Sequence, residues 1–335
     1  MKYNVVLFGA GGAGREALQH MRKHGHEPVA FSDNDATRWD TMFDGVRIVS
    51  PGEAMLYPYV TFVVTIYRSY AREARNQLRA MGVTVGSLGD YAPVCSGLPT
   101  SDETNRLRSL LTEQESLAEL LDQLVFRRNL DYDAQRLPSD IKDIYFPDFI
   151  APRTDEVFVD CGACDGDTVR EFVKRRSDRY RRIIAFEPDV ENYHKMLSSC
   201  RQYAECEFHK SAVSSYTGHT PFNSNGSMSS SINVGVKNMI PCTTIDDIEN
   251  VDPTYIKMDV EGSELAAIVG ARAVIKAYQP VLAVCAYHRS FHLWEIPFML
   301  NRMVPDYELR LRRYAEGARE LVWYAVPKNR IVCGS

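Results

Sequence analysis

The sequence lacks the features that mark several specialised classes of protein. It has no long run of lysine or arginine and a formal net charge of −5, so we expect no nucleic-acid partner, because phosphate binding needs a concentrated basic surface. No apolar run reaches the roughly 18 residues of a membrane-spanning helix, so no membrane partner is expected either. The start of the chain shows no secretory-signal pattern. These absences predict a protein of the cytoplasm.

The eight cysteines lack the regular spacing of a disulfide framework, which indicates a reducing, cytoplasmic compartment. Cys161 and Cys164 form a C-x-x-C pair, but no second pair stands at the spacing of a zinc site. Because the pair lies inside a glycine turn, we interpret the two cysteines as small residues that fill this turn.

The residues that are present have the composition of a globular protein long enough for two domains. Of the 335 residues, 45% are hydrophobic and 25% are charged. Residues 93–150 begin with a stretch rich in proline, glycine and serine and continue with leucines at helical spacing. We therefore predict a smaller domain at 1–92, a helical linker at 93–150 and a larger domain at 151–330.

Both predicted domains alternate strand and helix patterns, which favours α/β folds with parallel sheets. In the smaller domain we expect strands at 4–8, 28–33 and 60–66 and helices at 14–25 and 69–82. In the larger domain we expect strands at 156–160, 182–186, 205–210, 255–259 and 280–286, with helices between most of them. Two strand patterns around a glycine turn at 307–327 predict that the second sheet ends in an antiparallel hairpin.

The stretch VFVDCGACDGDTV, residues 157–169, has the pattern of a buried strand that ends in a small-residue turn before a helix. Glu187 follows the next strand, where an acid can accept hydrogen bonds from both ribose hydroxyls of an adenosine ligand. Asp160, Asp165 and Asp167 lie in or beside the turn. These acids would repel a diphosphate but suit a sulfonium group, so the local charge favours S-adenosylmethionine over NAD.

Five stretches occur in an order that carries a family resemblance: VFVDCGACDGDT, AFEPD, TTIDDI, YIKMDVEGSELAAIVGA and PVLAVCAYH. Over about 153–327 they resemble the FkbM-type family of S-adenosylmethionine-dependent O-methyltransferases. The resemblance implies a class I methyltransferase fold, with the small residues of the turn under the cofactor and Glu187 on its ribose. The stretch CAYHR departs from the family, because many relatives carry a glutamate after the fifth strand. The predicted cofactor-binding residues are Asp160, Gly162, Ala163, Gly166, Thr168, Glu187 and Asp259.

Three residues are candidates for catalysis at the ends of the fourth and fifth strands. Asp259 ends one strand, Glu261 follows two residues later, and His288 ends the neighbouring strand. Methyl transfer to a hydroxyl needs removal of a proton, so we predict His288 as the general base, because histidine titrates near neutral pH. Asp259 would orient this histidine or hold the acceptor hydroxyl. The same three side chains also resemble ligands for Mg²⁺ or Mn²⁺, and this alternative stays open.

Two further parts of the sequence are expected beside the methyl acceptor. His292 and Trp294 follow the fifth strand and are expected to line an acceptor pocket. The polar stretch NSNGSMSSSINVG, residues 223–235, is expected to be a lid over that pocket.

A second glycine turn, FGAGGAGREAL, stands near the start of the chain, and Asp33 follows at the distance typical of a dinucleotide fingerprint. With the stretches FSDND and DGVRIVSPGEA, it resembles the small nucleotide-binding domains attached to bacterial sugar-modifying enzymes. That resemblance implies a Rossmann-like domain with a nucleotide or nucleotide-sugar site. The start of the helix would hold a phosphate through backbone N–H groups, and a degenerate domain used only for packing is the alternative. The predicted nucleotide-binding residues are Gly9, Gly11, Gly12, Gly14 and Asp33.

These observations predict a cytoplasmic, S-adenosylmethionine-dependent O-methyltransferase. Its expected substrate is the hydroxyl of a sugar or nucleotide-linked sugar in bacterial glycan or secondary-metabolite biosynthesis. One alternative is an NAD-dependent oxidoreductase that uses the first domain, and the other is a non-catalytic nucleotide-sensing protein. A small molecule or nucleotide sugar is the expected partner, and a homo-oligomer is left open.

Overall fold

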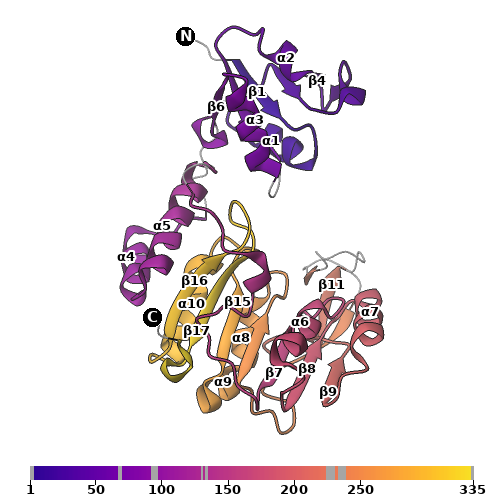
Figure 1. The fold of residues 1–335 in the computed structure, drawn as a ribbon, viewed down its shortest axis with the longest axis vertical. Helices are drawn as coiled ribbons and strands as arrows, with labels where there is room; N and C mark the ends of the chain where they lie inside the picture. Colours follow the sequence, from indigo (N-terminus) through magenta and orange to yellow (C-terminus); the bar gives the residue numbers. More distant parts are fainter. Residues whose placement is uncertain are drawn as a thin grey trace. The chain divides into compact units, whose positions relative to one another are not determined.

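The computed structural model describes residues 4–66, 70–91, 97–129, 131–132, 135–223, 231–232 and 239–332. The chain forms two compact units (Figure 1). The first unit comprises residues 1–98, 118–139 and 313–319, and the second comprises 99–117, 140–312 and 320–335. The segment expected to link two domains is therefore shared between the units.

The first unit is built on a six-stranded sheet with the order β3-β4-β2-β1-β5-β6. Its neighbouring strands run parallel except for β3, which is antiparallel to β4. The strands are β1 (Asn4–Phe8), β2 (Ala30–Ser32), β3 (Met42–Phe43), β4 (Val46–Val49), β5 (Val60–Val64) and β6 (Thr84–Gly86), and the helices are α1 (Gly12–Lys23), α2 (Pro51–Ala54) and α3 (Tyr70–Ala80).

Alternate residues of β1 enter two separate hydrophobic cores, because successive side chains of a strand point to opposite faces. Val5 and Leu7 pack in the core that contains Leu18 of α1. Val6 and Phe8 pack in the core that contains α3 residues such as Leu78. The strand is thus covered on both faces, as its continuous apolar run predicts.

The second unit contains a seven-stranded sheet with the order β16-β17-β15-β14-β7-β8-β9. The five strands from β15 to β9 run parallel to their neighbours, while β17 is antiparallel to β15. The five parallel strands confirm the expected ones to within two residues at each end. The strands are β7 (Val157–Cys161), β8 (Arg182–Phe186), β9 (Cys206–His209), β14 (Tyr255–Met258), β15 (Val281–Cys285), β16 (Glu308–Arg313) and β17 (Leu321–Val326).

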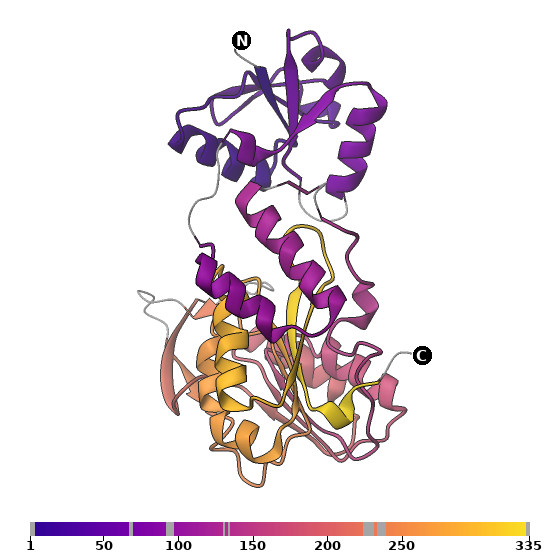
Figure 2. The ribbon, with the colours of Figure 1, turned by 90° about the vertical axis from the view of Figure 1, so that its left-hand side faces the viewer.

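The second unit also contains helices. Three of them, α8, α9 and α10, contact one another on one face of the sheet (Figure 2). The leucine-rich part of the predicted linker forms two helices, α4 (Ser101–Leu110) and α5 (Gln114–Asn129), and α5 continues into the first unit. The other helices are α6 (Asp167–Arg176), α7 (Val190–Cys200), α8 (Glu264–Gly270), α9 (Arg272–Tyr278) and α10 (His292–Met303).

A smaller sheet, with the order β10-β13-β11-β12, is inserted between β9 and β14. Its strands are β10 (Ala212–Val213), β11 (Gly218–Asn223), β12 (Ser231–Ile232) and β13 (Met239–Thr243). Most of the stretch predicted to form a lid, residues 223–235, lies outside the described residues.

The strand order of the large sheet creates a switch point beside β7. From β7 the chain proceeds to β8 and β9 on one side, and later to β14 and β15 on the other. Open α/β sheets bind ligands at the carboxyl ends of the strands at such a point. In the part of the chain that the structure describes, no helix is long and apolar enough to cross a membrane.

Candidate functional site

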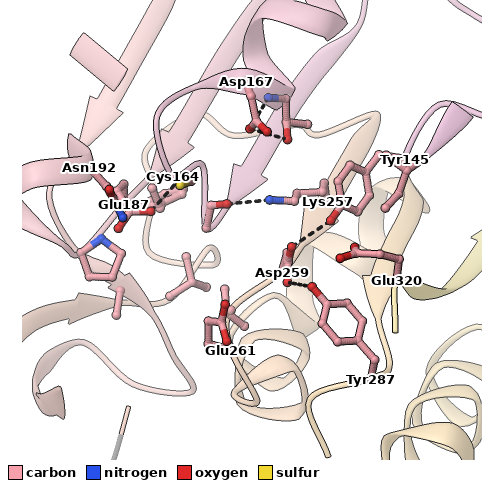
Figure 3. A pocket seen from close by; sticks show the side chains of 18 of the residues that line it. Tyr145, Cys164, Asp167, Glu187, Asn192, Lys257, Asp259, Glu261, Tyr287 and Glu320 are labelled. Atoms are coloured by element: carbon pink, nitrogen blue, oxygen red, sulfur yellow. Dashed lines mark hydrogen bonds between the residues drawn. The ribbon is translucent and has the colours of Figure 1, made fainter. Parts of the chain in front are cut away.

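A cavity of about 360 Å³ lies at the carboxyl ends of β7, β8 and β14, where the switch point predicts a ligand (Figure 3). All residues that line it belong to the second unit. They are Ile141, Ile144, Tyr145, Gly162, Cys164, Asp167, Thr168, Phe186, Glu187, Pro188, Asn192, Ser211, Ala212, Val213, Lys257, Asp259, Val260, Glu261, Tyr287 and Glu320.

The glycines of the turn after β7 are required by close packing of backbone. Gly162 has a φ of +82°, and a Cβ there would lie 1.9 Å from the carbonyl oxygen of Asp259. Gly166 has a φ of +84°, and its Cβ would lie 2.5 Å from the sulfur of Cys200. A side chain at either position would be strained and would clash. The turn therefore brings β7 backbone against the end of β14, and Gly162 and Thr168 face the cavity.

Glu187 forms one side of the cavity and is held there by backbone groups (Figure 3). Its Oε2 accepts the N–H of Cys164 at 2.8 Å, and its Oε1 accepts the N–H of Asp189 at 2.8 Å. Burial raises the pKa of Glu187 to about 7, although these two N–H groups favour the charged form. The carboxylate is thus fixed in position and can accept further hydrogen bonds from a ligand in the cavity.

Asp160 is buried next to the glycine turn and does not line the cavity. Its place therefore differs from that of the cofactor ligand predicted from the sequence. It is fully buried, and its Oδ1 lies 3.1 Å from the Nζ of Lys257. The same ammonium donates to the carbonyl oxygen of Gly162 at 2.6 Å. Burial alone would lower the pKa of Lys257, but the carboxylates of Asp160 and Asp259 raise it. This buried ion pair therefore holds the glycine turn in place, because the ammonium of Lys257 contacts both Asp160 and the carbonyl oxygen of Gly162.

Asp259 directly follows β14 and lies on the opposite side of the cavity from Glu187 (Figure 3). Its Oδ2 accepts a hydrogen bond from the hydroxyl of Tyr145 at 2.8 Å, and its Oδ1 faces the hydroxyl of Tyr287 at 3.4 Å. Burial would raise the pKa of Asp259, but Lys257 and then His288 lower it. Asp259 is therefore an ionised acceptor held between two phenols.

His288 belongs to the same side, but it lies behind the cavity wall. Its Nδ1 donates to Glu264 Oε1 at 2.8 Å, and its Nε2 lies 3.5 Å from Asp259 Oδ1 and 3.4 Å from Glu261 Oε2. Burial would lower its pKa, but Glu264, Asp259 and Glu261 raise the pKa to about 9. The expectation that His288 titrates near the ordinary imidazole value is therefore wrong for the protein without a bound cation, and a role in catalysis stays a prediction.

Glu261 faces the cavity from a strained backbone. Its φ is +53°, in the left-handed region that non-glycine residues rarely adopt, and Gly262 follows with a φ of +99°. Burial raises the pKa of Glu261 to about 7. Strain of this kind persists only where the surroundings impose it, and it concentrates at functional sites.

The residues at the start of α10 do not take the place that the sequence analysis expected. His292 and Trp294 are buried, and neither is among the described residues that line the cavity. The Nδ1 of His292 lies 3.2 Å from Glu264 Oε2, so this histidine packs beside the carboxylate that holds His288. Both residues therefore contribute to the site only by packing outside the cavity.

Tyr145 is the site residue that sequence reasoning missed most clearly. The stretch around it, LPSDIKDIYFPDFI, contains prolines and aromatic residues without a regular period, a pattern that indicates packing on the domain that follows and no role in a site. The structure brings Ile141, Ile144 and Tyr145 into the cavity wall. Tyr145 has a left-handed φ of +68°, which depends on the tertiary structure and which no local sequence pattern predicts.

The two thiols of the C-x-x-C pair both have raised pKa values. Cys161 is buried in β7, and burial raises its pKa. Burial likewise raises the pKa of Cys164 to about 11, with Glu187 adding to the shift. Both thiols are therefore protonated at neutral pH and unreactive.

The glycine turn of the first unit is braced by Asp33. Its Oδ2 accepts the N–H of Ala10 at 2.9 Å and lies 3.4 Å from the guanidinium of Arg38. A Cβ on Gly14 would lie 2.2 Å from the carbonyl oxygen of Gly9, whose own φ is +111°. Gly11 and Gly12, in contrast, have open space around them at the start of α1. The turn thus leaves its outer backbone accessible, while Asp33 already has partners.

Comparison with family models gives two matches. Residues 160–314 match the methyltransferase FkbM domain, and residues 1–86 match the C2185-like, N-terminal domain. A search of curated proteins finds no match.

A solved structure shares the fold of this chain. The crystal structure of methyltransferase FkbM from Methylobacillus flagellatus KT is 23% identical, with a TM-score of 0.74, and the match covers 96% of this chain and 90% of that chain. The fibrillarin of Aeropyrum pernix, solved in complex with S-adenosyl-L-methionine, is 12% identical with a TM-score of 0.33, covering 56% of this chain and 71% of that chain. Residues 160–314 thus match the model of the methyltransferase FkbM domain, and the chain has a fold of the class I methyltransferase type.

Proposed function

We propose that the protein is an S-adenosylmethionine-dependent O-methyltransferase that acts on the hydroxyl of a sugar or nucleotide-linked sugar. The observation that carries this proposal is the cavity at the switch point, with Glu187 on one side and Asp259 among phenols on the other. A cytoplasmic location and self-association stay predictions.

The residues of the cavity fit the proposed cofactor. S-adenosylmethionine supplies a methyl carbon that its sulfonium group has already activated. Glu187 can accept hydrogen bonds from the ribose hydroxyls, and the glycine turn leaves room for the rest of the molecule beside Thr168. The lining contains one ammonium, Lys257, and five carboxylates: Asp167, Glu187, Asp259, Glu261 and Glu320. This balance favours a cationic ligand and disfavours the diphosphate of NAD.

The side of the cavity around Asp259 is suited to a polyhydroxylated acceptor. The carboxylates of Asp259 and Glu261 can accept hydrogen bonds, and the phenols of Tyr145 and Tyr287 offer donors and acceptors. Holding a hydroxyl in line with the methyl group can lower the activation barrier of the transfer by roughly 7–11 kcal/mol. Because this side is acidic, the phosphates of a nucleotide-linked acceptor should remain outside it.

Transfer of a labelled methyl group tests the proposal directly. We expect the full-length protein to bind S-adenosylmethionine in calorimetry and to label at least one member of a panel of sugars and nucleotide sugars. Binding of NAD with hydride transfer would instead support the oxidoreductase. Absence of both binding and transfer would support the non-catalytic alternative.

The affinity for S-adenosylmethionine should fall below pH 7. Glu187 has a pKa of about 7, and the ribose hydroxyls bind its charged form, so binding at lower pH must first release a proton. The dissociation constant should therefore rise by about tenfold for each pH unit well below 7 and level off above it. Glu187→Gln should remove this dependence, while Glu261→Gln, which changes the other lining carboxylate with a pKa of about 7, should retain it. A flat profile for the wild-type protein would contradict the assignment.

For the first unit we propose a nucleoside diphosphate or its sugar as ligand, held at the accessible backbone of Gly11 and Gly12. Such a ligand should raise the melting temperature of the full-length protein. Gly12→Asp should abolish this rise, because a carboxylate would repel the phosphates in a space where the side chain itself fits. Gly52→Asp, at another glycine with open space, is the matched control and should leave the shift intact. No shift with any nucleotide would favour the packing-only alternative.

A further inference from the structure

We propose that His288, Asp259 and Glu261 bind a divalent transition-metal cation, and that Glu264 orients the imidazole for this purpose. The inference concerns the binding of a cation to these side chains and does not rest on the identity of the cofactor or acceptor. Three features of the site support it: the distances from His288 to the two carboxylates, the tautomer that Glu264 favours in the neutral ring, and access through the cavity.

The distance from His288 to each of the two carboxylates suits ligands that share one cation. The Nε2 of His288 lies 3.5 Å from Asp259 Oδ1 and 3.4 Å from Glu261 Oε2. Two ligand atoms bound to one cation at about 2.0–2.2 Å lie roughly 3.0–3.5 Å apart. The side chain of His288 is only 9% exposed, and its Nε2 makes no hydrogen bond within the described residues. A buried ring nitrogen without a hydrogen bond is therefore aimed at two carboxylates.

Glu264 selects the form of the imidazole that can bind a cation. It is fully buried, and its Oε1 accepts the Nδ1–H of His288 at 2.8 Å. When a cation displaces the second proton of the ring, Glu264 keeps the remaining proton on Nδ1, and the lone pair of Nε2 then points toward Asp259 and Glu261. Metal-binding histidines typically donate their other N–H to a carboxylate in this manner. The same Oε1 accepts the backbone N–H groups of Val260 and Gly262 at 3.1 and 3.2 Å, so Glu264 also shapes the loop that carries Glu261.

Glu264 is itself a poor choice for the third ligand, although one of its oxygens lies within 4.8 Å of ligand atoms of Asp259 and His288. Its Oε1 is occupied by three N–H groups, and its Oε2 faces His292 at 3.2 Å. Asp259 keeps Oδ1 available, because Tyr145 takes Oδ2 and the contact of Oδ1 with Tyr287 is long, at 3.4 Å.

Asp259 and Glu261 line the cavity, so a cation can enter from it and keep open coordination positions toward it. The strained backbone of Glu261, with a φ of +53°, holds this residue in the loop where its carboxylate meets His288. One imidazole with two carboxylates suits Mn²⁺, Fe²⁺ or Zn²⁺ better than Mg²⁺, which prefers oxygen ligands. A cation there would bind an oxygen of the acceptor and lower its pKa.

Titration of the chelator-treated, full-length protein with Mn²⁺, followed by the loss of the free-ion signal in electron paramagnetic resonance, tests the proposal. We expect one Mn²⁺ per chain. His288→Ala and Glu261→Gln should each weaken this binding by at least 100-fold, and Glu264→Gln by about 10- to 100-fold. His209→Ala is the matched control, since His209 also contacts a carboxylate, Glu207, at 2.7 Å but lies away from the cluster. It should leave the affinity unchanged.

Failure of the cation proposal can be distinguished from failure of the proposed function. Calorimetry on the same samples measures the binding of S-adenosylmethionine at the Glu187 side of the cavity. Retained binding also shows that a variant is folded. If neither Mn²⁺ nor Zn²⁺ binds, or if binding survives in both His288→Ala and Glu261→Gln, the proposal is overturned. In that case His288 is an imidazolium paired with the two carboxylates. Cation binding without S-adenosylmethionine binding would leave this inference standing and overturn the function.

Discussion

Glu187→Ala should weaken the binding of S-adenosylmethionine by roughly 10- to 1,000-fold. The carboxylate of Glu187 is positioned by the N–H groups of Cys164 and Asp189, and its remaining lone pairs face the cavity. Two hydrogen bonds from ribose hydroxyls to a charged acceptor contribute about 1.5–3 kcal/mol each. Alanine removes both of them and also leaves the two backbone N–H groups without this partner.

The measurement is a calorimetric dissociation constant at pH 8, where Glu187 is mostly charged. Glu191→Ala is the control, because Glu191 is an exposed acid in the first turn of α7, four residues away. Circular dichroism of both variants checks that the fold persists. An affinity of Glu187→Ala within a few-fold of the wild-type value would refute the ribose assignment.

His288→Ala should lower kcat by about 100- to 10,000-fold and change the affinity for S-adenosylmethionine only slightly. The ring stands at the wall beside Asp259 and Glu261, on the side of the cavity opposite Glu187. Its loss removes either a cation ligand or the positive charge that pairs with these carboxylates. Each change alters the groups that hold the acceptor, and loss of a proton-transfer or charge-stabilising group has effects of this size.

Steady-state kinetics with an acceptor identified from the panel measure this effect. His209→Ala should retain the wild-type kcat, since His209 lies at the end of β9 and pairs with Glu207. A kcat of His288→Ala within a few-fold of wild type would show that His288 has no part in the transfer. Rescue of a partly active Glu261→Gln variant by excess Mn²⁺ would assign the effect to cation binding.

Much of the architecture could be predicted from local patterns. The continuous apolar runs of β7 and β8 indicate buried parallel strands, since both faces of such a strand are covered. The two strands follow each other along the chain, and an acid follows the second strand. This pattern was sufficient to place Glu187 beside the cavity. Short-range information was enough here, because strand ends and the turns after them are neighbours in sequence.

The roles of individual acids and of His288 could not be predicted in this way. Asp160 lies one residue before the end of β7 and Asp259 one residue after the end of β14, yet Asp160 is buried against Lys257 while Asp259 faces the cavity. Which of two such residues reaches a ligand depends on the packing of neighbouring strands. Likewise, the three carboxylates around His288 come from the loop after β14 and the start of α8, and their distances decide its protonation.

The sequence by itself determined the α/β alternation, the glycine turn after β7, the acid after β8 and the match of residues 160–314 to the methyltransferase FkbM domain. These features depend on residues close together in the chain. The tertiary structure alone decided that Tyr145 joins Asp259, that Lys257 supports Gly162, and that Glu264 directs His288 toward Glu261. Each of these contacts joins different elements of the fold. Their geometry depends on how strands and loops pack together, and no local pattern of residue types encodes it.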